Sequence, residues 1–273
     1  MSANTRGKTA AAIEAAGGKA LVAYLPVGYP DLETSIEAAV AVADAGFQVL
    51  ELGIPYSDPA MDGPVIQAAT QQVLDRGFSL SEVFQTVEAV TARTDAAVLS
   101  MTYWNPVLRY GVDRLAHDFA AAGGAGLITP DLTPENADEW IAAAEKHDLD
   151  RIFLAAPSSS DARIDRAVEA SRGFVYTVST MGTTGVRGDM DTAARTLSER
   201  IAESSARVGK PIARCVGLGI SRPEHVADVL DYAEGAIVGS ALVAALRDGG
   251  VPAVAAKAAE LVTGLHSDPG TLS

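Results

Sequence analysis

The chain has 273 residues, of which 48% are hydrophobic and only 5% aromatic, so small aliphatic side chains must build most of its core. Lys and Arg number 21 against 35 Asp and Glu, which gives a net charge of −14. This charge argues against nucleic acid or an anionic membrane as a partner. Cys215 is the only cysteine, which excludes an internal disulfide and suits a reducing compartment. No apolar stretch approaches the length of about 18 residues that a membrane span needs, so we expect a soluble, cytoplasmic protein.

Short apolar runs alternate along the chain with longer Ala-rich segments. The runs are residues 20–25, 47–54, 96–103, 126–129, 151–156, 174–179, 212–217 and 236–240. They are apolar at consecutive positions, which is typical of parallel strands buried on both faces. Helices are predicted between them, over residues 34–46, 79–94, 112–123 and 136–148 among others.

This alternation predicts an α/β fold, a closed (β/α)8 TIM barrel with parallel strands. An open doubly wound sheet is the alternative, because the number of strands does not show closure. No linker divides the chain, so we expect one domain over residues 1–273, with residues 266–273 as a frayed tail. The stretch 179–190, rich in Gly and Thr, is expected to be a mobile loop on the catalytic face.

Three acids lie close together in "ELGIPYSDPAMDGP", residues 51–64. Glu51 lies late in the second predicted strand, and barrel enzymes carry their catalytic groups at the carboxyl ends of strands. A buried Glu without a partner has a raised pKa, which suits a proton donor and acceptor near neutral pH. A Glu held by backbone donors or an Arg is the alternative. Asp58 and Asp62, each taken alone, are also typical of turns.

The glycines of "GLGIS" (217–221) and "GS" (239–240) follow the seventh and eighth predicted strands. Barrels often bind phosphate with these two loops and a helix N-terminus, so we predict a phosphate site there. Such a site needs no Lys, which fits the acidic composition. The four histidines fall in helical patterns or in the tail, so we expect them on the surface and expect no His-ligated metal site. They are His117, His147, His225 and His266.

At this point the sequence strongly resembles the tryptophan synthase α subunit family. Its signature is a strand glutamate followed eleven residues later by a loop aspartate, as in Glu51 and Asp62. The resemblance continues through "YLPVGYPD" (24–31), "MTYWNP" (101–106), the loop at Pro130, Asp131 and Leu132, "YTVSTMGTTG" (176–185) and both glycine motifs. It implies cleavage of indole-3-glycerol phosphate into indole and glyceraldehyde 3-phosphate, without a metal or organic cofactor in this chain.

The resemblance also implies a role for each matching residue. Glu51 becomes the general acid and base that protonates the indole ring, and Asp62 stabilises positive charge at the indole nitrogen. Tyr24, Tyr103 and Ile128 match the indole pocket, with Tyr176 near it; aromatic or aliphatic core is their alternative. Thr184 matches a lid threonine that helps to place Asp62. The phosphate site is matched by Gly185, Gly217, Gly219, Gly239 and Ser240.

The family binds a β subunit that contains pyridoxal phosphate and consumes the indole, in an α2β2 heterotetramer. The resemblance therefore implies that Asp58 contacts this partner. Two details differ from many relatives: Tyr24 stands where Phe is expected, and Leu218 where an aromatic residue is often found. The lid sequence "TTGVRG" also differs from the expected pattern.

Other functions fit less well. A Schiff-base aldolase needs a Lys at the carboxyl end of a strand, whereas Lys210 precedes the seventh predicted strand. A stand-alone indole-releasing lyase and a catalytically idle relative that only binds a β-type partner are the further alternatives. Glu51 and Asp62 argue against the idle relative.

Overall fold

The computed structural model of the protein describes residues 6–59, 61–178 and 187–266; side chains are not described for residues 187–190. In these ranges one sheet is formed, and its strands all pair in parallel. They are β1 (Ala20–Pro26), β2 (Val49–Gly53), β3 (Ala97–Met101), β4 (Gly126–Ile128), β5 (Asp150–Ile152), β6 (Leu154–Ala155), β7 (Phe174–Val178), β8 (Ala213–Gly217) and β9 (Gly235–Val238).

The sheet closes on itself at Phe153. The strand order runs from β5 through β4, β3, β2, β1, β9, β8 and β7 to β6. Its two end strands are consecutive in the chain, because Phe153 alone separates β5 from β6. The Phe153 carbonyl accepts a hydrogen bond from the Tyr176 N–H at 3.0 Å, which continues the pairing with β7. The closed barrel is therefore confirmed, the open sheet is excluded, and the fifth predicted strand is divided into β5 and β6.

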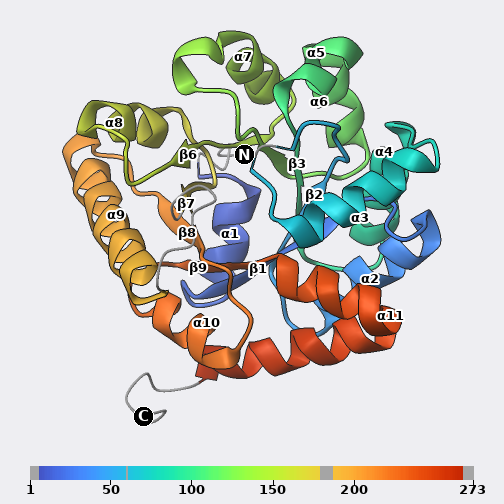
Figure 1. Ribbon diagram of the computed structural model, residues 1–273. Helices are drawn as coiled ribbons and strands as arrows, with labels where there is room; N and C mark the ends of the chain where they lie inside the picture. Colours follow the sequence, from blue (N-terminus) through green and yellow to red (C-terminus); the bar gives the residue numbers. More distant parts are fainter. Residues whose placement is uncertain (1–5, 60, 179–186, 267–273) are drawn as a thin grey trace.

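Helices surround the strands in a ring, except α1, which lies across the centre of this view (Figure 1). They are α1 (Lys8–Ala15), α2 (Leu32–Asp44), α3 (Pro64–Asp75), α4 (Ser81–Thr91), α5 (Trp104–Tyr110), α6 (Val112–Ala121), α7 (Asp138–Lys146), α8 (Asp161–Ala170), α9 (Arg187–Val208), α10 (Pro223–Leu230) and α11 (Ser240–Val262), with the 3-10 turns η1 (Pro134–Asn136) and η2 (Thr263–His266). The loop predicted over 179–190 is therefore too long by four residues, since α9 begins at Arg187. None of these helices is long and apolar enough to cross a membrane.

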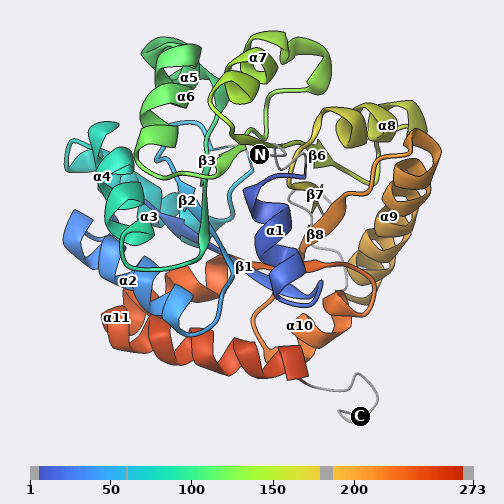
Figure 2. The ribbon, with the colours of Figure 1, turned by 180° about the vertical axis from the view of Figure 1, so that it is seen from behind.

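Helix α1 covers the amino end of the barrel (Figure 2). Ile13 of α1 packs with the interior side chains of Ala20, Val49 and Cys215. The carboxylate of Asp150, at the start of β5, accepts hydrogen bonds from the Thr9 N–H at 2.8 Å and the Thr9 hydroxyl at 2.6 Å.

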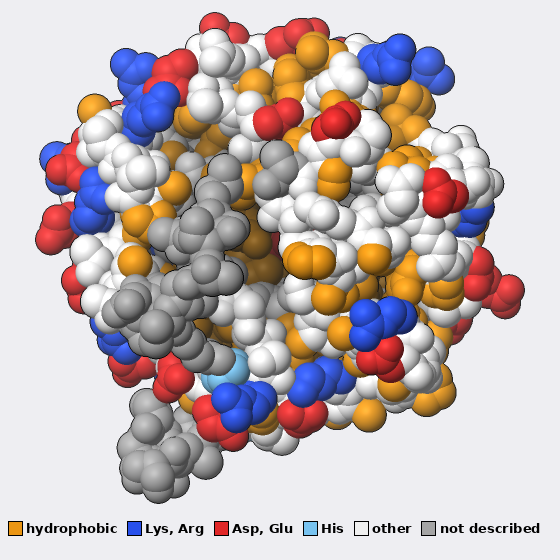
Figure 3. Space-filling model, viewed as in Figure 1, with side chains coloured by type: hydrophobic (Ala, Val, Ile, Leu, Met, Phe, Trp, Pro, Cys, Tyr) orange, Lys and Arg blue, Asp and Glu red, His pale blue; other side chains and the backbone are white. Residues whose placement is uncertain are grey.

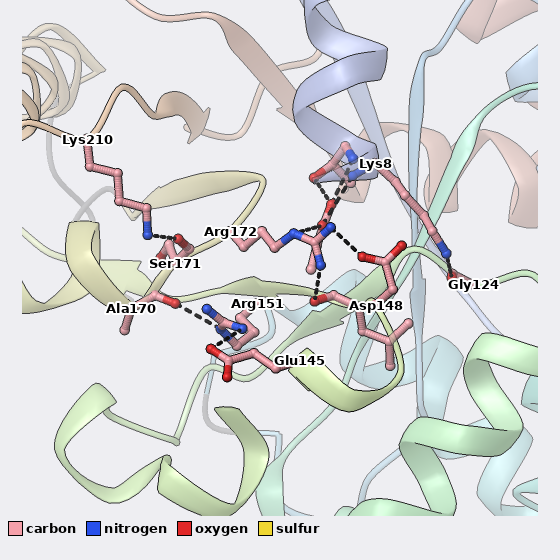
Figure 4. A network of polar contacts seen from close by, with 12 residues as sticks. Lys8, Gly124, Glu145, Asp148, Arg151, Ala170, Ser171, Arg172 and Lys210 are labelled. Atoms are coloured by element: carbon pink, nitrogen blue, oxygen red, sulfur yellow. Dashed lines mark hydrogen bonds and ion pairs between the residues drawn. The ribbon is translucent and has the colours of Figure 1, made fainter. Parts of the chain in front are cut away.

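Further polar contacts join α1 to the strands around it (Figure 4). The Lys8 ammonium donates to the Gly124 carbonyl at 3.1 Å, and the Lys8 N–H donates to Asp150 at 3.2 Å. Arg172 lies 3.6 Å from the same carboxylate. Lys210 belongs to this end as well, where its ammonium donates to the Glu169 and Ser171 carbonyls at 2.5 and 2.6 Å. Because α1 covers the amino end, we expect a ligand to reach the barrel interior at the opposite, carboxyl end of the strands.

Strand register decides which side chains point into the barrel. Tyr24 of β1 pairs with Glu51 of β2, and Glu51 pairs with Leu99 of β3. Because alternate residues of a strand share one face, each interior row continues two residues further along its strand. In β2 the row runs from Val49 to Glu51 and ends at Gly53.

Candidate active site

The predicted site residues that the structure describes meet at the carboxyl end of the barrel. Tyr24, Glu51, Ile128 and Tyr176 lie in four different strands and are buried or half-buried. Figure 3 shows a hollow near the centre of this face, with hydrophobic side chains at its depth. The position agrees with the general placement of catalytic groups in barrels.

Glu51 is a carboxyl group enclosed by the barrel. It has no exposed surface, and neither carboxyl oxygen has a hydrogen-bond partner in the described parts of the chain. Burial raises the pKa of Glu51 to about 8, because a charge in a low-dielectric interior is poorly solvated. The sequence-based expectation of a buried Glu with a raised pKa is confirmed. Glu51 is thus protonated at neutral pH and able to donate.

Asp62 lies in the loop between β2 and α3, immediately before the Gly63 cap of that helix. Its N–H donates to the Pro59 carbonyl at 3.1 Å, which forms a turn, and its carbonyl accepts from the Gln67 side chain at 2.8 Å. Burial raises the pKa of Asp62 to about 6. At pH 7 Asp62 is therefore mostly ionised while Glu51 is mostly protonated, so the two carboxyl groups are suited to different tasks.

Tyr103 connects the end of β3 to the loop that carries Asp62. Its hydroxyl accepts a hydrogen bond from the Met61 N–H at 2.9 Å, and its ring stacks on Tyr56 with centroids 4.9 Å apart. Burial first, and then the charge of Asp62 among others, raises the pKa of Tyr103 to about 12. The hydroxyl therefore stays protonated and keeps a proton to donate.

Tyr24 and Tyr176 lean over glycines of neighbouring strands. A Cβ built on Gly53 would lie 2.3 Å from the Tyr24 hydroxyl, and one on Gly217 would lie 2.9 Å from the Tyr176 hydroxyl. A side chain at either glycine would displace a tyrosine ring. Because these two positions have no side chain, both rings fit at the carboxyl end of the barrel.

The predicted phosphate residues lie at the ends of β8 and β9. Gly217 ends β8, and Gly219 has a φ of +61°, a conformation that glycine adopts without strain. Gly239 precedes α11, and Ser240 is the exposed first residue of that helix. The first N–H groups of a helix have no partner within it and attract anions. A Cβ on Gly239 would lie 3.4 Å from the Tyr24 Cβ, so this end adjoins the ring pocket.

Some predicted residues lie elsewhere or outside the described ranges. Thr184 and Gly185 are in the undescribed stretch 179–186. Asp58 is exposed in the loop after β2, where the Ser57 hydroxyl donates to its carboxylate at 2.8 Å. The tail predicted over 266–273 is described only at His266, which ends η2.

The expectation of surface histidines is wrong for His225. His117 and His266 are exposed and His147 is half-buried, but His225 is only 5% exposed. It lies on the inner face of α10, where its Nδ1 accepts a hydrogen bond from the Ser221 N–H at 3.3 Å. The ring thus supports the loop that carries Gly219. The helical pattern in the sequence showed no sign of this hydrogen bond, so it could not separate His225 from the other three histidines.

Two further residues were not assigned a role from the sequence. Gly53 accommodates Tyr24, and its position two residues after Glu51 was the available signal. Asp131 accepts the Trp104 N–H with both carboxylate oxygens, at 2.9 and 3.1 Å, and so fixes the start of α5 beside Tyr103. Among the described residues, no group of three or more His, Cys, Asp or Glu could hold a metal ion.

Comparison with known proteins identifies sequences of the same kind. The family model described as "Tryptophan synthase alpha chain" matches residues 10–266. The chain is 62% identical over 251 residues to the tryptophan synthase alpha chain of Leifsonia xyli subsp. xyli, covering 92% of this chain and 94% of that one. It is 53% identical over 248 residues to that of Mycobacterium avium, covering 90% and 89%.

Solved structures agree with the sequence relatives. Tryptophan synthase of Mycobacterium tuberculosis superposes with a TM-score of 0.89 at 46% identity, covering 96% of this chain and 99% of that chain. The tryptophan synthase complex of Pyrococcus furiosus superposes with a TM-score of 0.79 at 32% identity, covering 89% and 98%.

Proposed function

Because the chain belongs to the tryptophan synthase alpha chain family, a family of lyases in tryptophan biosynthesis, we propose that it cleaves indole-3-glycerol phosphate to indole and glyceraldehyde 3-phosphate. The observation that carries this proposal is Glu51, a fully buried carboxyl without a hydrogen-bond partner in the described ranges and with a pKa of about 8. Such a group is costly to the fold, and a carboxyl with so perturbed a pKa in a cleft is typical of a functional site.

The proposed reaction needs one proton shuttle. Glu51 donates its proton to the ring carbon that carries the side chain, which leaves a positive charge on the ring nitrogen. The carboxylate then removes the proton from the side-chain hydroxyl next to the ring, and the carbon–carbon bond breaks as an aldehyde forms. The bonding electrons restore the aromatic ring, and Glu51 is protonated again.

Asp62 is the group that we assign to the charge on the ring nitrogen. With a pKa of about 6 it is mostly ionised at the pH where Glu51 is mostly protonated. A fixed anion in a partly buried site stabilises a cation that develops during the reaction. Gly217, Gly219, Gly239 and Ser240 supply the backbone N–H groups and the α11 N-terminus that we assign to the phosphate.

A β subunit is the partner that we propose, since structural neighbours are tryptophan synthase complexes. An apolar cavity of about 360 Å³ lies beside the site, between the end of β2 and α5, and is lined by Ile54, Tyr56, Phe78 and Pro106 among others. Leu108 of α5 is 52% exposed and is the one large hydrophobic side chain so exposed in the described ranges. This surface and exposed Asp58 suit contact with the β subunit in an α2β2 heterotetramer.

Pyridoxal phosphate belongs in this proposal to the β subunit, which consumes the indole. The proposal assigns this chain no cofactor of its own. A single domain over residues 1–273 and a cytoplasmic location stay predictions from the sequence.

The test is indole release from indole-3-glycerol phosphate by the purified chain, alone and with a tryptophan synthase β subunit. We expect slow release that increases strongly with the β subunit. Glu51→Gln should lower release by about 10²- to 10⁴-fold under both conditions, because the variant has no proton to donate. Asp58→Asn should keep the basal rate and lose part of the activation.

The other outcomes have definite meanings. Fast release without a β subunit would favour the stand-alone lyase. Absence of release under both conditions would contradict the proposed reaction. Unchanged release by Glu51→Gln would remove Glu51 from the proton transfer, and full activation of Asp58→Asn would remove Asp58 from the partner contact.

A further inference from the structure

Within the site, Tyr24 carries a hydroxyl group that takes no part in the proposed proton transfer. Tyr24 pairs with Glu51 across β1 and β2, and in parallel strands paired residues point to the same side of the sheet. Its side chain is only 6% exposed. The phenol ring therefore stands beside the acid and base of the reaction.

The hydroxyl of Tyr24 lies on the mouth side of Glu51. Gly53 follows Glu51 by two residues, so the Cβ that it lacks would point into the barrel directly above the Glu51 side chain. The Tyr24 hydroxyl fills that space, 2.3 Å from where such a Cβ would be. A ligand that reaches Glu51 from the mouth must therefore pass beside this hydroxyl.

The protonation state of Tyr24 is settled by its surroundings. Burial, and then the charges of Asp62 and Glu51, raise the pKa of Tyr24 well above its ordinary value. The group remains a hydroxyl, and it forms no hydrogen bond with another described residue. A phenol proton without a partner in the protein is available to an acceptor on a ligand.

We propose that the Tyr24 hydroxyl donates a hydrogen bond to a side-chain hydroxyl of the substrate, beside the bond that breaks, and so selects a hydroxylated side chain. This inference rests on the proposed function and adds to it a residue that recognises the hydroxyl on the substrate's side chain. The ring of Tyr24 borders Gly53 on one side and Gly239 on the other. The hydroxyl lies at the Gly53 end of the ring, beside the proton shuttle, while the Cβ end of Tyr24 adjoins Gly239.

The experiment compares two ligands in two variants. One ligand is indole-3-glycerol phosphate, and the other is 3-(indol-3-yl)propyl phosphate, which has the ring and the phosphate but no side-chain hydroxyl. Tyr24→Phe removes one oxygen and keeps the ring. The matched control is Tyr232→Phe at the end of α10, outside the barrel, where the hydroxyl donates to Asp191 at 3.1 Å.

In Tyr24→Phe we expect kcat/KM for the substrate to fall about three- to tenfold, the range for one neutral hydrogen bond. The inhibition constant of the propyl phosphate should stay within about twofold, since that ligand has no side-chain hydroxyl to accept from Tyr24. Tyr232→Phe should leave both values unchanged.

Two results would overturn the inference. If kcat/KM does not change in Tyr24→Phe, the hydroxyl makes no contact that the reaction needs. If binding of both ligands weakens equally, Tyr24 shapes the pocket but its hydroxyl does not recognise the side-chain hydroxyl of the substrate. Wild-type cleavage of the substrate is measured in the same series, so failure of the proposed function is seen separately. Binding of the propyl phosphate to Tyr24→Phe also shows that this variant is folded.

Discussion

The hydroxyl oxygen of Tyr103 accepts a hydrogen bond from the backbone N–H of Met61 at 2.9 Å, one residue before Asp62. Tyr103 follows β3 directly and is 8% exposed, so its ring is fixed by the barrel. Asp62, in contrast, lies in a loop. The contact therefore transmits the rigidity of the barrel to the carboxylate that is proposed to stabilise the ring cation.

Tyr103→Phe should lower kcat about fivefold and lower the free energy of unfolding by no more than about 1 kcal/mol. The loss follows from a less well-placed Asp62, and one neutral hydrogen bond is typically worth about 1 kcal/mol. The measurement is a double-mutant cycle with Asp62→Asn. In the Asp62→Asn background the second substitution should have little further effect. Fully additive losses would show that Tyr103 acts independently of Asp62.

The pH dependence of kcat/KM should be bell-shaped, with limbs near pH 6 and pH 8. Activity rises through pH 6 as Asp62 ionises, and it falls through pH 8 as Glu51 loses the proton that it must donate. Asp62→Asn should remove the acid limb from the remaining activity and leave the basic limb in place. An acid limb that persists in this variant would have to arise from another group.

Glu51→Gln should stabilise the folded protein, and more so at high pH. The folded pKa of Glu51, about 8, lies above its ordinary value of 4.5, so the folded state binds the proton more tightly. Stability is therefore greatest below pH 4.5 and is lost as the pH rises toward 8.

Removing the ionisable group should add on the order of 3 kcal/mol at pH 7, by the relation of about 1.36 kcal/mol per pKa unit. Urea unfolding of wild type and variant at pH 5, 7 and 8 measures this gain. The difference should shrink at pH 5. A gain that does not depend on pH would show that Glu51 is not buried as a neutral acid.

The sequence was sufficient to place the strands along the chain and to identify the acids near the site, because both depend on local patterns. Consecutive apolar residues predict the strands, and an acid inside such a run predicts a buried Glu51, which burial and the raised pKa confirm. The roles of Glu51 and Asp62 stay predictions. The closed barrel was predicted from the repeated strand and helix pattern, but the division of the fifth strand at Phe153 and the pairing of β6 with β7 could not be, since they depend on contacts between strands.

The contacts between strands could not be predicted from the sequence either. The fit of the Tyr24 hydroxyl against Gly53 depends on the register of β1 and β2, which no local pattern contains. The burial of His225 depends on how α10 is rotated about its axis and on the loop that it meets. Long-range pairing thus decides the details of the pocket, while the local pattern decides which residues reach it.

At the amino end of the barrel, Thr9→Val should lower the free energy of unfolding by about 1–2 kcal/mol. The substitution keeps the shape of a fully buried side chain and removes a donor to the buried Asp150 carboxylate. Thr94→Val is the control, because that hydroxyl donates to the Val90 carbonyl at the end of α4 and the residue is half-buried. Thermal or urea unfolding measures both variants, and KM should not change in either. An equal loss in the two variants would show that Asp150 does not depend on Thr9.

Leu108→Glu should leave basal cleavage unchanged and weaken activation by a β subunit. Leu108 is exposed on α5, next to the apolar cavity beside the site, and a charge there would have to be desolvated when a partner covers it. Titration of activity with the β subunit measures the effect, and we expect half-maximal activation at a concentration about tenfold higher or more. Ala256→Glu introduces the same charge at an exposed position of α11 and should not shift the titration. If the two variants respond alike, the β subunit binds at another face of the barrel.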